Sequence, residues 1–178
     1  MTTPAHRVLL FALFGVASGA AAAAVFELTD AGGVLFYTAP GLVFGVIFGA
    51  ILWRGRIIGP VRATIYGLAA ALSHGVAVFT ALSIVEPLQH LLGGADDPGM
   101  VASGVIAGAV GGGLLAGATR LLAPIRRWPL LLAAGAVLGG LLPVAVDIDA
   151  LGPFIFYMLW QGGYAATLAA LLPRIEKV

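Results

Sequence analysis

The chain has 178 residues, of which 61% are hydrophobic and only 10% charged, and its mean hydropathy is +1.07. A soluble domain carries about 25% charged residues, so this chain has too little polar surface to cover itself in water. The absence of cysteine excludes disulfides, a thiol nucleophile and a thiolate metal site. The formal net charge of +1 indicates no particular partner by itself. We expect a single all-α membrane domain over residues 1–178.

Six segments are long and apolar enough to cross a bilayer, which takes about 20 helical residues. In chain order they are 8–26, 34–53, 63–85, 100–119, 129–146 and 153–172. Because the connections are short, consecutive helices should be antiparallel. The sequence therefore predicts a polytopic six-transmembrane-helix bundle.

The first segment has a rival interpretation. Arg7, an apolar run and the small residues 17–24 are also typical of a secretory signal peptide with its cleavage zone. A match between this first segment and the fifth one argues against cleavage of the first segment as a signal peptide. The matched pairs, at identical spacing, are Arg7 with Arg127, Gly15 with Gly135, Gly19 with Gly139 and Glu27 with Asp147. We therefore expect residues 8–26 to remain as the first span.

The charged residues separate by side. All nine Lys and Arg residues fall on one predicted side: Arg7, Arg54, Arg56, Arg62, Arg120, Arg126, Arg127, Arg174 and Lys177. Seven of the eight acidic residues fall on the other. By the positive-inside rule, both termini are cytoplasmic. The expected location is the plasma membrane, and the Ala- and Gly-rich composition favours a bacterial inner membrane.

The match between segments extends to the even-numbered ones. When Arg54 is aligned with Arg174, residues 35–37 fall on residues 155–157, and the middle hairpin from Arg62 to Arg120 fits more loosely. This pattern favours three repeats of one helical hairpin about an axis along the membrane normal. The alternative is coincidence within a Gly-rich bundle.

Small residues recur four apart in several segments, a spacing that lets helix backbones approach closely in lipid. The glycines concerned are Gly15/Gly19, Gly41/Gly45/Gly49, Gly104/Gly108/Gly112, Gly113/Gly117 and Gly135/Gly139. Intramolecular packing is the preferred interpretation, with homodimer faces or a mobile seam as alternatives. The fourth segment is the least apolar and should be the most protein-surrounded. Pro40 and Pro143 should kink their helices.

Two polar residues fall deep within the predicted hydrocarbon. His74 is the one ionisable side chain well inside it, and Gln161 lies at a similar depth. With Trp160, Tyr157 and Tyr66 they form a candidate ligand-binding site for an uncharged or weakly charged solute. The alternative is structural: a neutral histidine bonded to a backbone carbonyl or to Gln161, joining helices.

The acidic side offers only a weak metal candidate. His90 with Asp96 and Asp97 is the best local cluster in a rim that also contains Glu27, Asp30, Glu86, Asp147 and Asp149. Hard cations prefer such oxygen ligands, but the spacing fits no metal loop and solvated loops are the preferred interpretation. The sequence predicts no metal and no cofactor.

Catalytic motifs are missing. Ser18 and Ser103 each stand in a Val-Ala-Ser-Gly run, but there is no Gly-x-Ser-x-Gly elbow, His-Glu-x-x-His run or P-loop. The chain is therefore not expected to be an enzyme. Its arginines are too few for nucleic-acid binding, and the lack of an acid at mid-membrane argues against an ion-coupled pump.

These observations favour a transporter, a channel or the substrate-binding subunit of a transporter. In span number, size and cytoplasmic termini the chain is similar to the substrate-binding components of energy-coupling vitamin transporters, although it shares no motif with them. The alternative is a non-transporting scaffold or accessory subunit that acts through helix–helix contacts. The expected partners are the lipid bilayer, a small solute, and a second copy or a membrane partner subunit.

Overall fold

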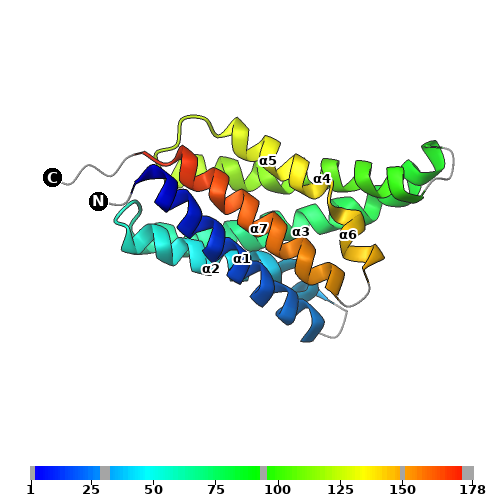
Figure 1. Cartoon of the computed structure of the whole chain (residues 1–178), viewed down its shortest axis with the longest axis horizontal. Helices are drawn as coiled ribbons and strands as arrows, with labels where there is room; N and C mark the ends of the chain where they lie inside the picture. The colour runs from blue at the N-terminus through cyan, green and yellow to red at the C-terminus, as the bar shows by residue number, and fades with distance from the viewer. Residues whose placement is uncertain (1–2, 29–32, 93–95, 149–150, 174–178) are drawn as a thin grey trace.

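The computed structural model describes residues 3–28, 33–92, 96–148 and 151–173, and within them the side chains of all but Phe26, Asp96, Asp97, Val146 and Asp147. The described residues are helical, without a strand (Figure 1). Five helices are long and apolar enough to cross a membrane: α1 (Pro4–Leu28), α2 (Val34–Arg54), α3 (Pro60–Leu91), α4 (Asp96–Leu122) and α7 (Gly152–Leu171). Five of the six predicted spans are thereby confirmed as long apolar helices.

The predicted span over 129–146 forms two helices rather than one, and the break lies beside Pro143, where the sequence predicts a kink. Helix α5 covers only Pro129–Gly139, and a turn at Gly140 and Leu141 separates it from the six-residue helix α6 (Leu142–Asp147). Pro143 lies at the start of α6, where it has no N–H to continue the ladder of α5. At about 1.5 Å per residue, the 11 residues of α5 span only about 16 Å, well short of the hydrocarbon thickness. The other expected kink, at Pro40, leaves α2 helical on both sides.

The helices pack in the order of a closed ring. Each of α1 to α4 packs on the next helix in the chain, α5 and α6 pack on α7, and α7 packs on α1. The first and last long helices are thus neighbours, and the two ends of the chain lie at the same end of the molecule (Figure 1). Arg7 on α1 reinforces this closure, because its guanidinium donates hydrogen bonds to the carbonyls of Leu172 and Pro173, each at 2.8 Å.

The α3–α4 hairpin is longer than the rest of the bundle. The 32 residues of α3 extend about 48 Å and the 27 residues of α4 about 40 Å, whereas the hydrocarbon core is about 30 Å thick. In Figure 1 this hairpin projects beyond the other helices at the end away from the termini. Helices α3 and α4 thus extend beyond the spans 63–85 and 100–119 predicted from hydropathy, because hydropathy falls at the first polar residues while the helical hydrogen bonding continues.

The outer surface is apolar, as lipid requires. In the most apolar stretch of α3 only 17% of residues are buried, and its exposed side chains include Leu68, Leu72 and Phe79. The corresponding stretch of α4 is 50% buried, more than that of any other of the five long helices. This confirms the prediction that the fourth span is the most protein-surrounded.

Glycine brings several helix pairs into backbone contact. A Cβ on Gly15 would lie 2.5 Å from the Gln161 carbonyl oxygen, one on Gly45 would lie 2.7 Å from Gly67 Cα, and one on Gly135 would lie 2.5 Å from the Gly108 carbonyl oxygen. These contacts join α1 to α7, α2 to α3 and α4 to α5. On the pair α3–α4, a Cβ on Gly111 would lie 2.9 Å from the Ser73 carbonyl oxygen.

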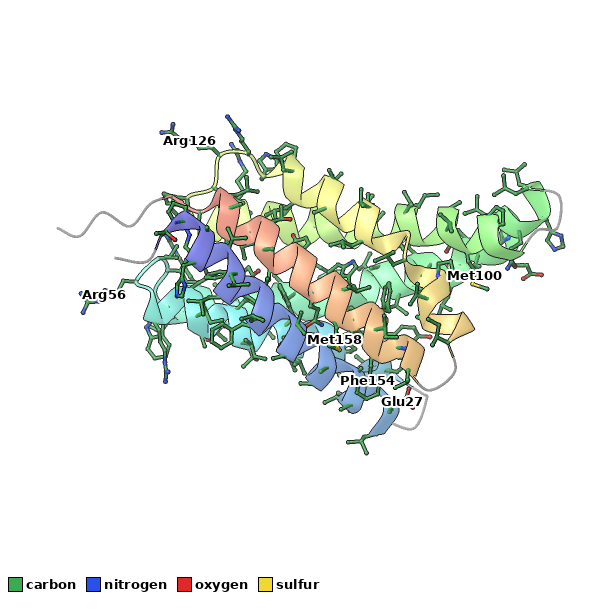
Figure 2. All side chains as sticks on the ribbon, in the orientation of Figure 1. Glu27, Arg56, Met100, Arg126, Phe154 and Met158 are labelled. Carbon is green, nitrogen blue, oxygen red and sulfur yellow. The ribbon has the colours of Figure 1, made fainter. Side chains whose placement is uncertain are left out.

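Charged side chains gather at the two ends of the bundle. Figure 2 shows Arg56 and Arg126 at the end that holds the termini and Glu27 at the opposite end. The connections α2–α3 and α4–α5 lie at the arginine end, where Arg56, Arg126 and Arg127 are exposed.

Candidate functional site

Gln161 lies on the inner face of α7 and joins three helices. It is buried, and its Oε1 accepts a hydrogen bond from Ser18 Oγ of α1 at 2.6 Å. Its Nε2 donates to the Pro40 carbonyl oxygen of α2 at 3.3 Å. The first bond depends on Gly15 and Gly19, because side chains at these positions would collide with the backbone of α7. One side-chain amide therefore connects α1, α2 and α7 inside the apolar part of the bundle.

His74 contacts the same stretch of α2 from the other side. Its Nδ1 lies 2.7 Å from the Tyr37 carbonyl oxygen, and its ring lies 5.7 Å from the ring of Tyr157 at an interplanar angle of 35°. This approach requires Gly41, since a Cβ there would lie 2.5 Å from His74 Cβ. Among the described residues, Gln161 and His74 each reach a backbone carbonyl of α2 and form no hydrogen bond with each other.

A second polar cluster lies nearer the arginine end and contains three buried hydroxyl groups. Tyr164 on α7 donates to the Gly112 carbonyl oxygen of α4 at 3.1 Å, and Thr119 on α4 donates to the Leu115 carbonyl oxygen at 2.6 Å. Tyr66 on α3 is fully buried and lies close to both side chains. Its hydroxyl nevertheless has no partner in hydrogen-bonding geometry among the described residues.

Aromatic rings fill the space between the two clusters. Trp160 stacks on Tyr164 with ring centroids 5.4 Å apart, and Phe44 stacks on Phe48 with centroids 4.4 Å apart. Phe44 also meets Tyr164 edge to face at 6.0 Å. These contacts link α2 to α7 across the centre of the ring.

The structure thus distributes the five predicted ligand-binding residues over one interior column. Tyr157 and His74 lie at one end of it, Gln161 and Trp160 in the middle, and Tyr66 at the other end. Measured along α7, residues 157–168 extend about 16 Å.

Sequence reasoning missed three contributors to this column. The Ser18 hydroxyl, interpreted as a packing group, is a partner of Gln161. Tyr164 and Thr119 complete the cluster around Tyr66. A signal for Tyr164 exists in the sequence, since residues 157, 161, 164 and 168 are spaced as one helix face and all four are buried. No comparable pattern marks Thr119.

Two grooves lie on the surface at the arginine end. One, of about 670 Å³, follows the α2–α3 connection, and the other, of about 520 Å³, lies between the start of α1 and the end of α7. Neither is lined by any of the five predicted ligand-binding residues.

The weak metal candidate falls partly outside the described residues. His90 is exposed at the end of α3, with its Nε2 3.8 Å from Glu86 Oε1, one helical turn away. The side chains of Asp96 and Asp97 are not among those described. In the described part of the chain, no group of three or more His, Asp or Glu side chains is placed to hold a metal ion.

Comparison of the chain with protein-family models, with curated proteins and with solved structures gave no match. The chemistry of the site therefore rests on its own side chains. An amide, an imidazole and five hydroxyl groups within an apolar bundle can exchange hydrogen bonds with a neutral molecule, and the column offers no carboxylate to balance a cation.

Proposed function

We propose that this protein binds a small uncharged or weakly charged solute within the membrane, as a transporter, a channel or the substrate-binding subunit of a transporter. The site is the interior column from His74 to Tyr66, centred on Gln161. Bound solute exchanges hydrogen bonds with the column and stacks against Trp160 and Tyr157. Enzymatic activity is not part of this proposal.

The observation that carries the proposal is the Tyr66 hydroxyl. A buried polar group without a hydrogen bond costs about 1–3 kcal/mol, and lipid provides no water to relieve that cost. The natural recipient is an acceptor oxygen or nitrogen on a small molecule within the column. Thr119 Oγ1 lies beside the Tyr66 hydroxyl and keeps acceptor lone pairs after donating its proton to the Leu115 carbonyl, but the two hydroxyls do not meet in hydrogen-bonding geometry.

The proposed architecture is a six-crossing bundle with both termini cytoplasmic. Helix α4 ends at the arginine end and α7 begins at the opposite end, so the chain between them crosses the bundle through α5 and α6 (Figure 1). A crossing made of two short helices exposes backbone groups at the turn between them. In transporters such breaks are tolerated where they line a cavity or are covered by protein. The matched spacing of arginine, glycine and acidic residues in 7–27 and 127–147 supports three hairpin repeats.

The test compares two tyrosines that differ only in their surroundings. Protein purified in mild detergent is examined by native mass spectrometry, and every co-purifying small molecule is recorded for wild type, Tyr66→Phe and Tyr37→Phe. We expect a bound small molecule that is lost in Tyr66→Phe and retained in Tyr37→Phe. Ligand-free Tyr66→Phe should unfold at the same or a higher temperature, because the substitution removes an unpaired hydroxyl.

Two outcomes contradict this proposal. A small molecule retained in both Tyr66→Phe and Gln161→Leu places the site elsewhere. If Tyr66→Phe lowers the unfolding temperature of a protein that carries no small molecule, the hydroxyl bonds to Thr119 and the carrying observation is lost.

A specific observation favours a second function, that of a non-transporting scaffold or accessory subunit. Both ends of the Gln161 amide are occupied by protein partners, and glycine contacts close several of the helix interfaces. A stoichiometric protein partner in the mass spectrum, with no small molecule, would favour this alternative.

A further inference from the structure

The α2–α3 connection carries an arginine in a backbone conformation that favours glycine. Helix α2 ends with hydrogen bonds from Arg56 N to the Trp53 carbonyl at 2.8 Å and from Ile57 N to the Leu52 carbonyl at 2.9 Å. This is the Schellman pattern, in which the residue at the Arg56 position adopts positive φ and is usually glycine. Arg56 has φ 56°, and in the described residues it is the one non-glycine with positive φ. A left-handed conformation is strained for an L-residue, so a glycine at this position would make the turn more stable.

Arg56 lines the groove of about 670 Å³, together with Arg62 from the first turn of α3. Both arginines are exposed, and neither has an acidic partner among the described residues. The groove therefore presents two guanidinium groups whose charge no described side chain neutralises.

The start of α3 adds backbone donors to the same groove. Gly59, the N-cap, provides no side-chain acceptor, and the first turn contains no acidic residue. The N–H groups of Val61 and Arg62 belong to the set that a helix leaves without an internal partner. Both residues line the groove, at the positive end of the α3 dipole.

Apolar side chains continue the groove toward the lipid-facing surface. Trp53 is 50% exposed and Val61 is 72% exposed, and both line the groove. Beyond them lies the exposed apolar surface of α2 and α3, which includes Val46, Ile65 and Leu68. A soluble anion would use the arginines and leave this apolar wall in water. A molecule with an anionic head and an acyl chain would cover both.

We propose that this groove binds an anionic phospholipid of the leaflet at the arginine end. The phosphate accepts hydrogen bonds from Arg56, Arg62 and the first turn of α3, and Trp53 lies at the level of the headgroup. One acyl chain continues along Val61 onto the outer surface of α3. This inference is independent of the solute site, which lies inside the ring.

The test uses phosphatidylglycerol as the anionic probe and phosphatidylcholine as the neutral one. Each lipid is titrated onto delipidated full-length protein in detergent, and bound lipid is counted by native mass spectrometry. We expect phosphatidylglycerol to bind at least tenfold more tightly than phosphatidylcholine. The double variant Arg56→Gly with Arg62→Gln should remove that preference.

Two features of the design separate a specific site from its alternatives. Arg56→Gly relieves the backbone strain, so this variant should unfold at the same or a higher temperature while it loses lipid. The matched control is Arg126→Gln with Arg127→Gln, which removes two exposed arginines from the same end of the bundle and should leave lipid binding unchanged.

Three results would overturn the proposal. Equal binding of the two lipids removes the anionic preference. An equal loss in the control variant shows general surface charge rather than a site. Complete displacement of phosphatidylglycerol by millimolar inorganic phosphate shows a soluble-anion site that makes no use of the acyl chain.

Discussion

Gln161 forms two interhelical hydrogen bonds in the interior through a single side chain. Its amide connects α1 and α2 to α7 through Ser18 and the Pro40 carbonyl. Hydrogen bonds between membrane helices contribute about 0.6 kcal/mol on average and up to about 1.7 kcal/mol. The two bonds of Gln161 therefore stabilise the packing of α1 and α2 on α7 in addition to the apolar contacts between these helices.

Replacement of Gln161 by leucine should lower the free energy of unfolding by about 1–2 kcal/mol, because two interhelical bonds are lost and the Ser18 hydroxyl loses its acceptor. Ser18→Ala should cost about half as much. Both are measured by equilibrium unfolding in mixed detergent micelles. Thr167→Val on the same helix removes only a bond to the Gly163 carbonyl of its own turn and is the control. Equal effects of Gln161→Leu and Thr167→Val would refute the bridging role.

At the scale of the helix, glycine positions differ sharply in what surrounds them. Gly135 on α5 faces α4 so closely that an added Cβ would lie 2.5 Å from the Gly108 carbonyl oxygen and 2.8 Å from Gly112 Cα. Gly117 on α4 has nothing within 4 Å of the same position. Of the two, only Gly135 is required by its contacts.

We therefore expect Gly135→Ala to destabilise the protein by about 1–3 kcal/mol, because α4 and α5 must separate. Gly117→Ala should be neutral or stabilising, since it only increases helix propensity. Thermal unfolding in detergent distinguishes them. Equal unfolding temperatures for the two variants would show that the α4–α5 interface adapts without cost.

The break between α5 and α6 can be measured as a distance. A straight helix would place the Cα atoms of Leu132 and Ile148 about 24 Å apart, at about 1.5 Å per residue. Because the chain has no cysteine, spin labels at these two exposed positions need no other changes. We expect pulsed electron paramagnetic resonance to give a shorter separation than that of a straight helix. Pro143→Ala should lengthen it, and an unchanged distance would locate the cause of the break in Gly140 and Leu141 alone.

For the whole molecule, the testable quantity is the side of the membrane on which each end lies. Leu121 stands at the arginine end, whereas Leu28 and Leu91 stand at the opposite end, and these side chains are 82%, 83% and 78% exposed. Single cysteines at Leu28 and Leu91 should react with a membrane-impermeant maleimide in intact cells. A cysteine at Leu121 should react only after permeabilisation. The reverse pattern would contradict cytoplasmic termini.

The sequence predicts the helices well and their contacts poorly, for a physical reason. An apolar run of 20 residues has one stable backbone state in lipid, so five spans could be located from composition alone. The kink at Pro143 could be predicted because proline has no N–H to donate, but hydropathy does not show that 129–146 divides into two helices at Gly140 and Leu141. The placement of Gln161 and His74 within the bundle followed from their depth. Their partners on α2 did not, because these depend on which helices become neighbours in the ring.

Because α1 packs on α7, the helices cannot form all their final contacts in the order in which they are synthesised. Helix α1 leaves the ribosome before α7, the helix whose Gln161 accepts the Ser18 hydrogen bond and whose backbone covers Gly15 and Gly19. Until α7 is inserted, the glycine face of α1 contacts lipid or the insertion machinery. In a chain that ends before residue 152, this face of α1 would have no partner helix. The proteases that degrade incomplete membrane proteins would then have an exposed glycine face to recognise.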